Sequence, residues 1–174
     1  MDNDYFPVPL TEMKANLDFR ELESEVNLGD IQVSYMFLNH PGLAIGFRIS
    51  YAGRSLVYIS DHENYGRLSP DGPGMHALDL EIARFAENAD LLISEAQYTE
   101  EEYKHKKGWG HSTFLDALER AAEAKVKRLA IIHHDPDHDD TFMDQISEFC
   151  QKMIKERNYT FSCFLAQEGK SVEL

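Results

Sequence analysis

Residues 128–140 read Arg128-Leu-Ala-Ile-Ile-His133-His134-Asp-Pro-Asp-His-Asp-Asp140. The first five form a short, mostly apolar run that is typical of a buried strand. The eight residues that follow are histidines and aspartates apart from one proline, and their side chains bind hard or borderline metal ions. The proline stiffens the loop, and an aspartate at its end also suits the start of a helix. The stretch therefore predicts a strand, a polar loop with candidate metal ligands, and then a helix.

On either side of this stretch, strand-like and helix-like patterns alternate. Apolar residues recur with helical spacing in 78–88, 112–124 and 139–157. Strands are expected at 31–38, 44–50, 55–60, 89–94 and 160–166, with the Ala52-Gly53 turn joining two of them into a hairpin. Hairpins followed by this alternation predict an α/β fold, a mixed sheet with helices packed on it.

Other segments carry weaker signals. Two prolines predict an extended arm at 5–10, and a cluster of glycines and prolines predicts a loop at 63–74. Residues 98–107 are charged and are expected to form a lid-like helix or loop. Ser112 is the expected N-cap of the helix that follows it, and 172–174 are expected to extend a final strand.

Polar residues stand at the ends of several predicted strands. His40 follows 31–38, Asp61 follows 55–60, and His133 follows 128–132. Taken alone, each histidine is typical of a surface position and the aspartate is typical of a turn. Open α/β sheets, however, bind ligands at the carboxyl ends of their strands. His111 precedes a helix N-terminus, where an anion is favoured and a protonated imidazole can donate to a leaving group.

The composition narrows the class of protein. A chain of 174 residues is expected to form a single domain, 1–174, and its net charge is 17 − 31 = −14. So acidic a chain is not expected to bind nucleic acids in general or anionic membranes, although a metal can still hold a small anionic substrate. The acidic start is unlike a signal peptide, and no apolar run reaches the ~20 residues of a membrane span. A cytoplasmic protein is expected.

Five segments together resemble one known family. They are 38–48, 56–61, 91–98, 108–113 and 128–136. In this order and spacing they are similar to the C-terminal half of the metallo-β-lactamase fold, in its ribonuclease Z-like and phosphodiesterase-like branch. The resemblance implies half of an αββα sandwich: a mixed sheet with helices on one face.

The resemblance also implies a site for divalent metals, usually zinc, manganese or iron. Carried over by motif, His40 matches a metal ligand and Asp61 matches the aspartate that bridges two metals. His133 matches the last histidine ligand, with His134 as the alternative. His111 matches the histidine that assists phosphodiester cleavage, which makes it the expected catalytic residue.

One departure from the family pattern limits these expectations. The main signature, H-x-H-x-D-H, does not occur in this sequence. The chain is therefore expected to be the C-terminal portion of a metal-dependent hydrolase acting on a small phosphodiester. Each metal would have about two protein ligands, fewer than the three of a catalytic zinc site, so weak or absent metal binding is expected for the chain alone. A complementary N-terminal half or a second copy is the expected partner.

Two other functions compete with the hydrolase. A non-catalytic interaction or oligomerisation module would use the sheet face that a half-sandwich leaves open. A phosphoacceptor receiver domain would also place an aspartate such as Asp61 at a strand tip. The sequence lacks the acidic pair and the late lysine that a receiver needs, which disfavours it.

Overall fold

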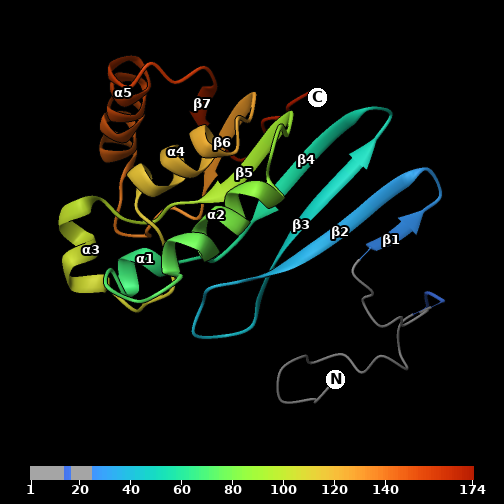
Figure 1. Ribbon diagram of the computed structural model, residues 1–174. Helices are drawn as coiled ribbons and strands as arrows, with labels where there is room; N and C mark the ends of the chain where they lie inside the picture. Colours follow the sequence, from blue (N-terminus) through green and yellow to red (C-terminus); the bar gives the residue numbers. More distant parts are fainter. Residues whose placement is uncertain (1–13, 17–24) are drawn as a thin grey trace.

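A mixed sheet of seven strands forms the centre of the computed structural model, which describes residues 14–16 and 25–174 (Figure 1). The strands are β1 (Glu25–Leu28), β2 (Ile31–Leu38), β3 (Ala44–Tyr51), β4 (Arg54–Ile59), β5 (Leu91–Glu95), β6 (Arg128–Ile132) and β7 (Ser162–Leu165). Their order in the sheet is their order in the chain. The pairs from β1 to β4 are antiparallel, and the pairs from β4 to β7 are parallel. The predicted α/β class with a mixed sheet is confirmed.

Helices connect the parallel strands. They are α1 (Tyr65–Leu68), α2 (Met75–Phe85), α3 (Glu100–Lys106), α4 (Phe114–Glu123) and α5 (Asp140–Glu156). Crossovers between parallel strands are almost always right-handed, and here each one steps to the next strand in the same direction. As a result α2, α4 and α5 lie on one face of the sheet, in front of it in Figure 1.

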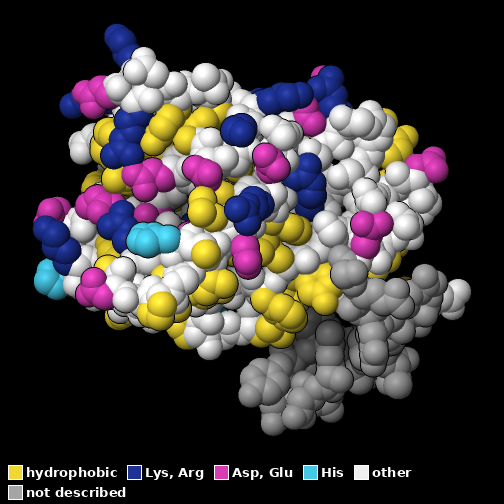
Figure 2. Space-filling model, viewed as in Figure 1, with side chains coloured by type: hydrophobic (Ala, Val, Ile, Leu, Met, Phe, Trp, Pro, Cys, Tyr) yellow, Lys and Arg dark blue, Asp and Glu magenta, His cyan; other side chains and the backbone are white. Residues whose placement is uncertain are grey.

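The core lies between this helix layer and the sheet. Val57, Leu92 and Leu129 are neighbours across β4, β5 and β6, and all three are fully buried in the main apolar cluster. Leu118 of α4 belongs to the same cluster. Figure 2 looks onto the helix side, where acidic and basic side chains are interspersed. Within the described ranges, none of the helices is both long and apolar enough to cross a membrane.

The opposite face of the sheet, called here the open face, is also apolar. Side chains that alternate with the core positions point to it, and no helix of the described residues packs there. They include Val33, Tyr35 and Phe37 of β2, Ile45, Phe47, Ile49 and Tyr51 of β3, and Leu56 and Tyr58 of β4. Three of them, Phe37 at 58%, Tyr51 at 57% and Ile49 at 38%, are exposed. Strands that are apolar on both faces normally lie between two layers.

Several local expectations were wrong or lie outside the description. The loop expected at 63–74 contains the short helix α1, and β1 was not predicted. Residues 172–174 form no strand. The N-cap of α4 is Thr113, because its Oγ1 accepts from Asp116 N at 3.1 Å while the Asp116 carboxylate accepts from Thr113 N at 3.0 Å. The arm expected at 5–10 lies outside the described residues.

Candidate metal centre

Four strands deliver the candidate site to one edge of the sheet. β2 and β4 are both antiparallel to β3, so β2, β4, β5 and β6 all run in the same direction. Their carboxyl ends are therefore at the same edge. His40 follows β2, Asp61 follows β4, and His133 follows β6 directly, so residues that are far apart in the sequence meet there.

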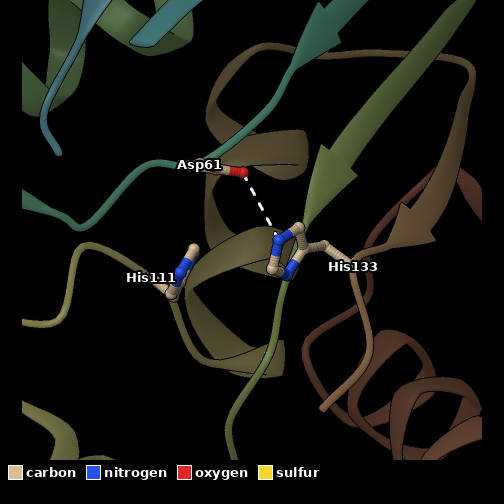
Figure 3. Close-up of side chains that lie close together, drawn as sticks. All are labelled: Asp61, His111 and His133. Atoms are coloured by element: carbon tan, nitrogen blue, oxygen red, sulfur yellow. Dashed lines mark ion pairs between the residues drawn. The ribbon is translucent and has the colours of Figure 1, made fainter. Parts of the chain in front are cut away.

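Asp61 lies between two histidines. Its Oδ1 is 3.5 Å from His133 Nε2, and its Oδ2 is 4.0 Å from His40 Nε2. His111 completes the group, since one ligand atom each of Asp61, His111 and His133 lies within 4.8 Å of the others (Figure 3). The His111 and His133 rings are stacked, with centroids 4.7 Å apart. Two imidazoles and a carboxylate converging in this way form a donor set that fits a zinc-like divalent ion.

His133 is held in a rarely used backbone conformation. Its φ is +62°, in the left-handed region that side chains other than glycine seldom adopt, and such strain concentrates at functional sites. Gln97 Nε2 lies 3.2 Å from His133 Nδ1. A turn of the Gln97 amide would present its oxygen to a proton on Nδ1, which leaves the His133 Nε2 lone pair for a metal. Gln97 therefore orients this ring.

His134, the alternative to His133, lies outside the cluster. Its Nδ1 is buried and has no hydrogen-bond partner among the described residues. The side chain lines a separate cavity beside α5 and β7, and burial lowers its pKa below the ordinary value. The geometry thus favours His133 for the ligand position.

The His40 ring is fixed by two glycines. Gly42 N donates to His40 Nδ1 at 3.0 Å, directly after the Pro41 turn. Gly110, at φ +92°, passes so close to the ring that a Cβ there would collide with it. The structure therefore places His40 beside Asp61, although His40 is not one of the three residues whose ligand atoms cluster most tightly.

A buried carboxylate stands behind His111. Glu95 has no exposed surface, and its Oε2 is 3.6 Å from His111 Nδ1, while Oε1 accepts from Ser112 N at 2.8 Å. Burial raises the pKa of Glu95, with His111 and Arg120 opposing that shift. Burial lowers the pKa of His111, but the carboxylates of Glu95, Asp61 and Glu63 together outweigh it, so this pKa is raised. A histidine in this setting can hold a proton for a leaving group, and its position also allows it to bind a metal.

A second buried carboxylate holds the turn that carries His111. Glu63 is 1% exposed and accepts from Gly108 N and Gly110 N, both at 2.8 Å, and from Tyr103 Oη at 2.6 Å. Beside it, His62 Nδ1 accepts from Asn39 N at 3.1 Å, which ties the end of β4 to the end of β2. The sequence pattern predicts no role for Glu63, Glu95 or Gln97. Their partners are distant in the chain, so no local pattern marks them.

Known proteins resemble this chain over much of its length. The family model "Beta-lactamase superfamily domain" matches residues 11–134. The ribonuclease Z of Sulfurisphaera tokodaii is 37% identical over 86 residues, which is 49% of this chain and 26% of that protein. The chain thus spans about a quarter of the length of this curated relative.

Two solved structures share the fold. The metallo-β-lactamase fold protein YhfI from Bacillus subtilis superposes with a TM-score of 0.61 at 20% identity, covering 84% of this chain and 51% of that one. The short form of human tRNase Z (ELAC1) gives a TM-score of 0.55 at 19% identity, covering 86% of this chain and 47% of that one. Membership in this group implies the use of a divalent metal, for which the Asp61 cluster is the candidate site. With a family model that matches most of its length and a ribonuclease Z-like fold, the chain belongs to the β-lactamase superfamily.

Proposed function

We propose that this chain carries the metal-binding half of a site that hydrolyses phosphodiesters. The observation that carries the proposal is the Asp61 carboxylate, whose two oxygens face different histidines at 3.5 and 4.0 Å. A carboxylate with one oxygen toward each side suits a bridge between two metals, which in such sites are about 3.5–4 Å apart. The name ribonuclease Z, borne by the curated relatives, supports a phosphodiester in RNA as the substrate class.

The residues of the chain divide the chemistry between them. Bound divalent metal ions would polarise a phosphate oxygen and lower the pKa of a water molecule. Asp61 and His133 would hold the ions. His40 would be a further ligand through Nε2 once its proton sits on Nδ1, which means giving up the hydrogen bond from Gly42 N. His111 would give its proton to the leaving oxygen as the P–O bond breaks, and Glu95 would hold the other ring nitrogen and stabilise the charged imidazole.

This set of ligands is short of what catalysis needs. A catalytic zinc usually has three protein ligands and a fixed open position, and H-x-H-x-D-H does not occur in the sequence. A complementary half-fold that carries this motif, seated on the open face, would bring the missing ligands to the same edge. The chain matches about half of each of the two solved structures named above, which supports such a complement.

The open face also favours a second candidate function. Phe37 and Tyr51 are more than half exposed on a sheet surface that is apolar from β2 to β4. Contiguous apolar patches of this kind mark interaction sites. A non-catalytic module that binds a second copy of itself through this face would need no metal.

Hydrolysis of bis-p-nitrophenyl phosphate separates the two functions. The chain is assayed with manganese or zinc, alone and mixed with a segment that carries H-x-H-x-D-H. The hydrolase proposal predicts little turnover by the chain alone and metal-dependent turnover by the mixture, lost with Asp61→Ala. A stable mixture that never turns over under any of these metals would contradict it. Turnover that survives Asp61→Ala would contradict it as well.

A further inference from the structure

A hollow of about 350 Å³ opens directly beside His111. Lys106, Trp109 and residues 135–137 line it, and Tyr98 and Gln97 complete the lining. His111 is part of its wall. A group in the hollow would therefore be next to the leaving oxygen that receives the His111 proton. Nothing in the metal centre itself requires an indole, an ammonium group and two carboxylates at this place.

Trp109 is displayed there at a structural cost. Its side chain is 57% exposed, although it follows Gly108 at φ +85° and precedes Gly110 at φ +92° in a turn whose backbone is fixed. The Glu63 carboxylate accepts hydrogen bonds from the N–H groups of both glycines, and Trp109 N donates to Lys106 O at 3.1 Å. A buried carboxylate thus fixes the backbone that carries an exposed indole. A rigid, exposed aromatic ring is what a stacking platform for a flat ligand requires.

The neighbouring charges define what would stack. Lys106 Nζ lies 4.4 Å from the centroid of the Trp109 ring and 5.7 Å from that of Tyr98, so it covers part of the platform with a cation. Elsewhere in the lining, Asp137 N donates to Asp135 Oδ1 at 3.0 Å, which fixes the loop. Asp135 Oδ2 and the Asp137 carboxylate remain as acceptors there. Carboxylates repel a phosphate but accept from ring and amino N–H groups, as an acidic side chain does from cytosine N4.

We propose that this hollow is a nucleobase subsite, in which Trp109 stacks on the base while Asp135 and Asp137 accept from its N–H groups. Guanine fits best, because its N1–H and 2-amino groups point the same way and can both meet one carboxylate. Uracil, with no amino group, fits worst. The subsite rests on the proposed function only for which bond is cleaved. In a phosphodiester hydrolase it would hold the base of the nucleoside bonded to the scissile phosphate. Base recognition here requires no metal.

The single tryptophan of the chain makes this testable without any activity. The intact chain in EDTA is titrated with GMP, IMP, UMP and ribose 5-phosphate while Trp109 fluorescence is recorded, and free N-acetyltryptophanamide corrects for absorption by the bases. GMP is expected to quench the fluorescence saturably. IMP, which lacks the 2-amino group, is expected to bind several-fold more weakly, and UMP more weakly still. Ribose 5-phosphate is expected to cause no quenching. Equal effects of ribose 5-phosphate and GMP, or no saturable quenching by any nucleotide, would overturn the subsite.

Variants separate recognition from folding. In calorimetric titrations, Trp109→Ala is expected to weaken GMP binding about tenfold, within the range that stacking on one aromatic side chain contributes. Asp135→Asn combined with Asp137→Asn is expected to abolish the preference for GMP over UMP. Lys107→Ala, a neighbouring exposed lysine outside the hollow, is expected to bind as the unmodified chain does. A double variant that keeps its preference for GMP would overturn the role of the carboxylates.

The same titration distinguishes the two proposals. GMP binding by a chain that hydrolyses nothing, even with its complement, supports the subsite while the proposed function fails. Hydrolysis of bis-p-nitrophenyl phosphate by a chain whose Trp109 responds to no nucleotide overturns the subsite and leaves the hydrolase standing.

Discussion

Oε2 of Glu63 accepts a hydrogen bond from Gly110 N at 2.8 Å, joining the residue two positions after Asp61 to the residue before His111. Oε1 of the same carboxylate accepts from Gly108 N and from Tyr103 Oη. One buried acid thus sets the distance between the end of β4 and the turn that carries His111 and Trp109. Without it, the candidate metal centre and the proposed base subsite would lose their common support.

Glu63→Gln is expected to destabilise the protein. An amide has one oxygen for three donors, and its NH₂ would face an N–H or O–H group in a site that is 1% exposed. The expected loss in the free energy of unfolding is about 1–3 kcal/mol, measured by urea denaturation, together with a shift in Trp109 emission. Glu101→Gln, on the exposed side of α3, is the control and is expected to change neither. A Glu63→Gln variant as stable as the control would contradict this role.

Gly110→Ala is expected to lower the free energy of unfolding more than Gly53→Ala does, although both glycines have a positive φ. Gly53 has φ +76° and open space around its Cβ position, so Gly53→Ala adds only backbone strain of about 1–2 kcal/mol. At Gly110, φ is +92° and the added methyl also meets the His40 ring and Pro41. Thermal unfolding should show a further loss of at least about 1 kcal/mol for Gly110→Ala, in the range of overpacking. Equal losses for the two variants would show that the contact with His40 carries no energy.

Asp90 is expected to make stability depend on acid pH. A hydrogen bond from Lys127, with others from Ser55 N and Arg54, lowers its pKa from 3.8 to about 2. Because the folded pKa lies below the unfolded one, this stabilisation is present above 3.8 and is lost as the pH falls through about 2.

The matching test is Asp90→Asn. Since Arg54 and Lys127 are themselves exposed, the expected loss near neutral pH is about 1–2 kcal/mol. Urea denaturation curves collected at several pH values should show this loss shrinking between about pH 4 and pH 2. Glu173→Gln, near the exposed end of the chain, controls for the change in net charge. A loss that stays constant down to pH 2 would assign the stabilisation to something other than the charge of Asp90.

The open face is expected to drive self-association of the chain when no complement is present. Phe37 pairs with Ile45 across β2 and β3 and is 58% exposed. Phe37→Asp would place a charge on that surface and should shift the sedimentation coefficient at micromolar concentration toward the monomer. Leu80→Asp, on an exposed position of α2, is the matched control. A parent chain that is already strictly monomeric and binds no hydrophobic dye would contradict the expectation.

The sequence predicted the elements whose signal is local. β2 and β6 match the expected bounds because their β-branched and apolar runs end at turn-forming or polar residues. The short elements β1 and α1 were not predicted, since four residues with little apolar periodicity resemble a loop. Thr113 caps α4 because Ser112 is occupied elsewhere: its Oγ donates to His62 O and accepts from Arg120. That competition exists only in the folded chain.

The candidate site was predictable in outline for a related reason. Parallel strands bring their carboxyl ends to one edge, so His40, Asp61 and His133 were expected to meet there. The polar groups that position them were not predictable, because Glu63 and Glu95 find their partners 16 to 47 residues away. His111 lies both in the cluster of candidate metal ligands and beside Glu95, so its position suits either a metal ligand or a proton donor, which spacing alone does not separate.

Metal binding by the isolated chain tests the central claim most directly. Cobalt(II) is titrated into the chain and followed by visible absorption and calorimetry, with Asp61→Asn, His133→Ala and the exposed-residue control His105→Ala alongside. The account predicts weak but saturable binding by the parent chain and by His105→Ala, because the chain alone supplies an incomplete ligand set. Affinities are expected to fall by about tenfold or more in the other two, as loss of a ligand or its support typically causes. Cobalt binding that is unchanged in both Asp61→Asn and His133→Ala would contradict the account.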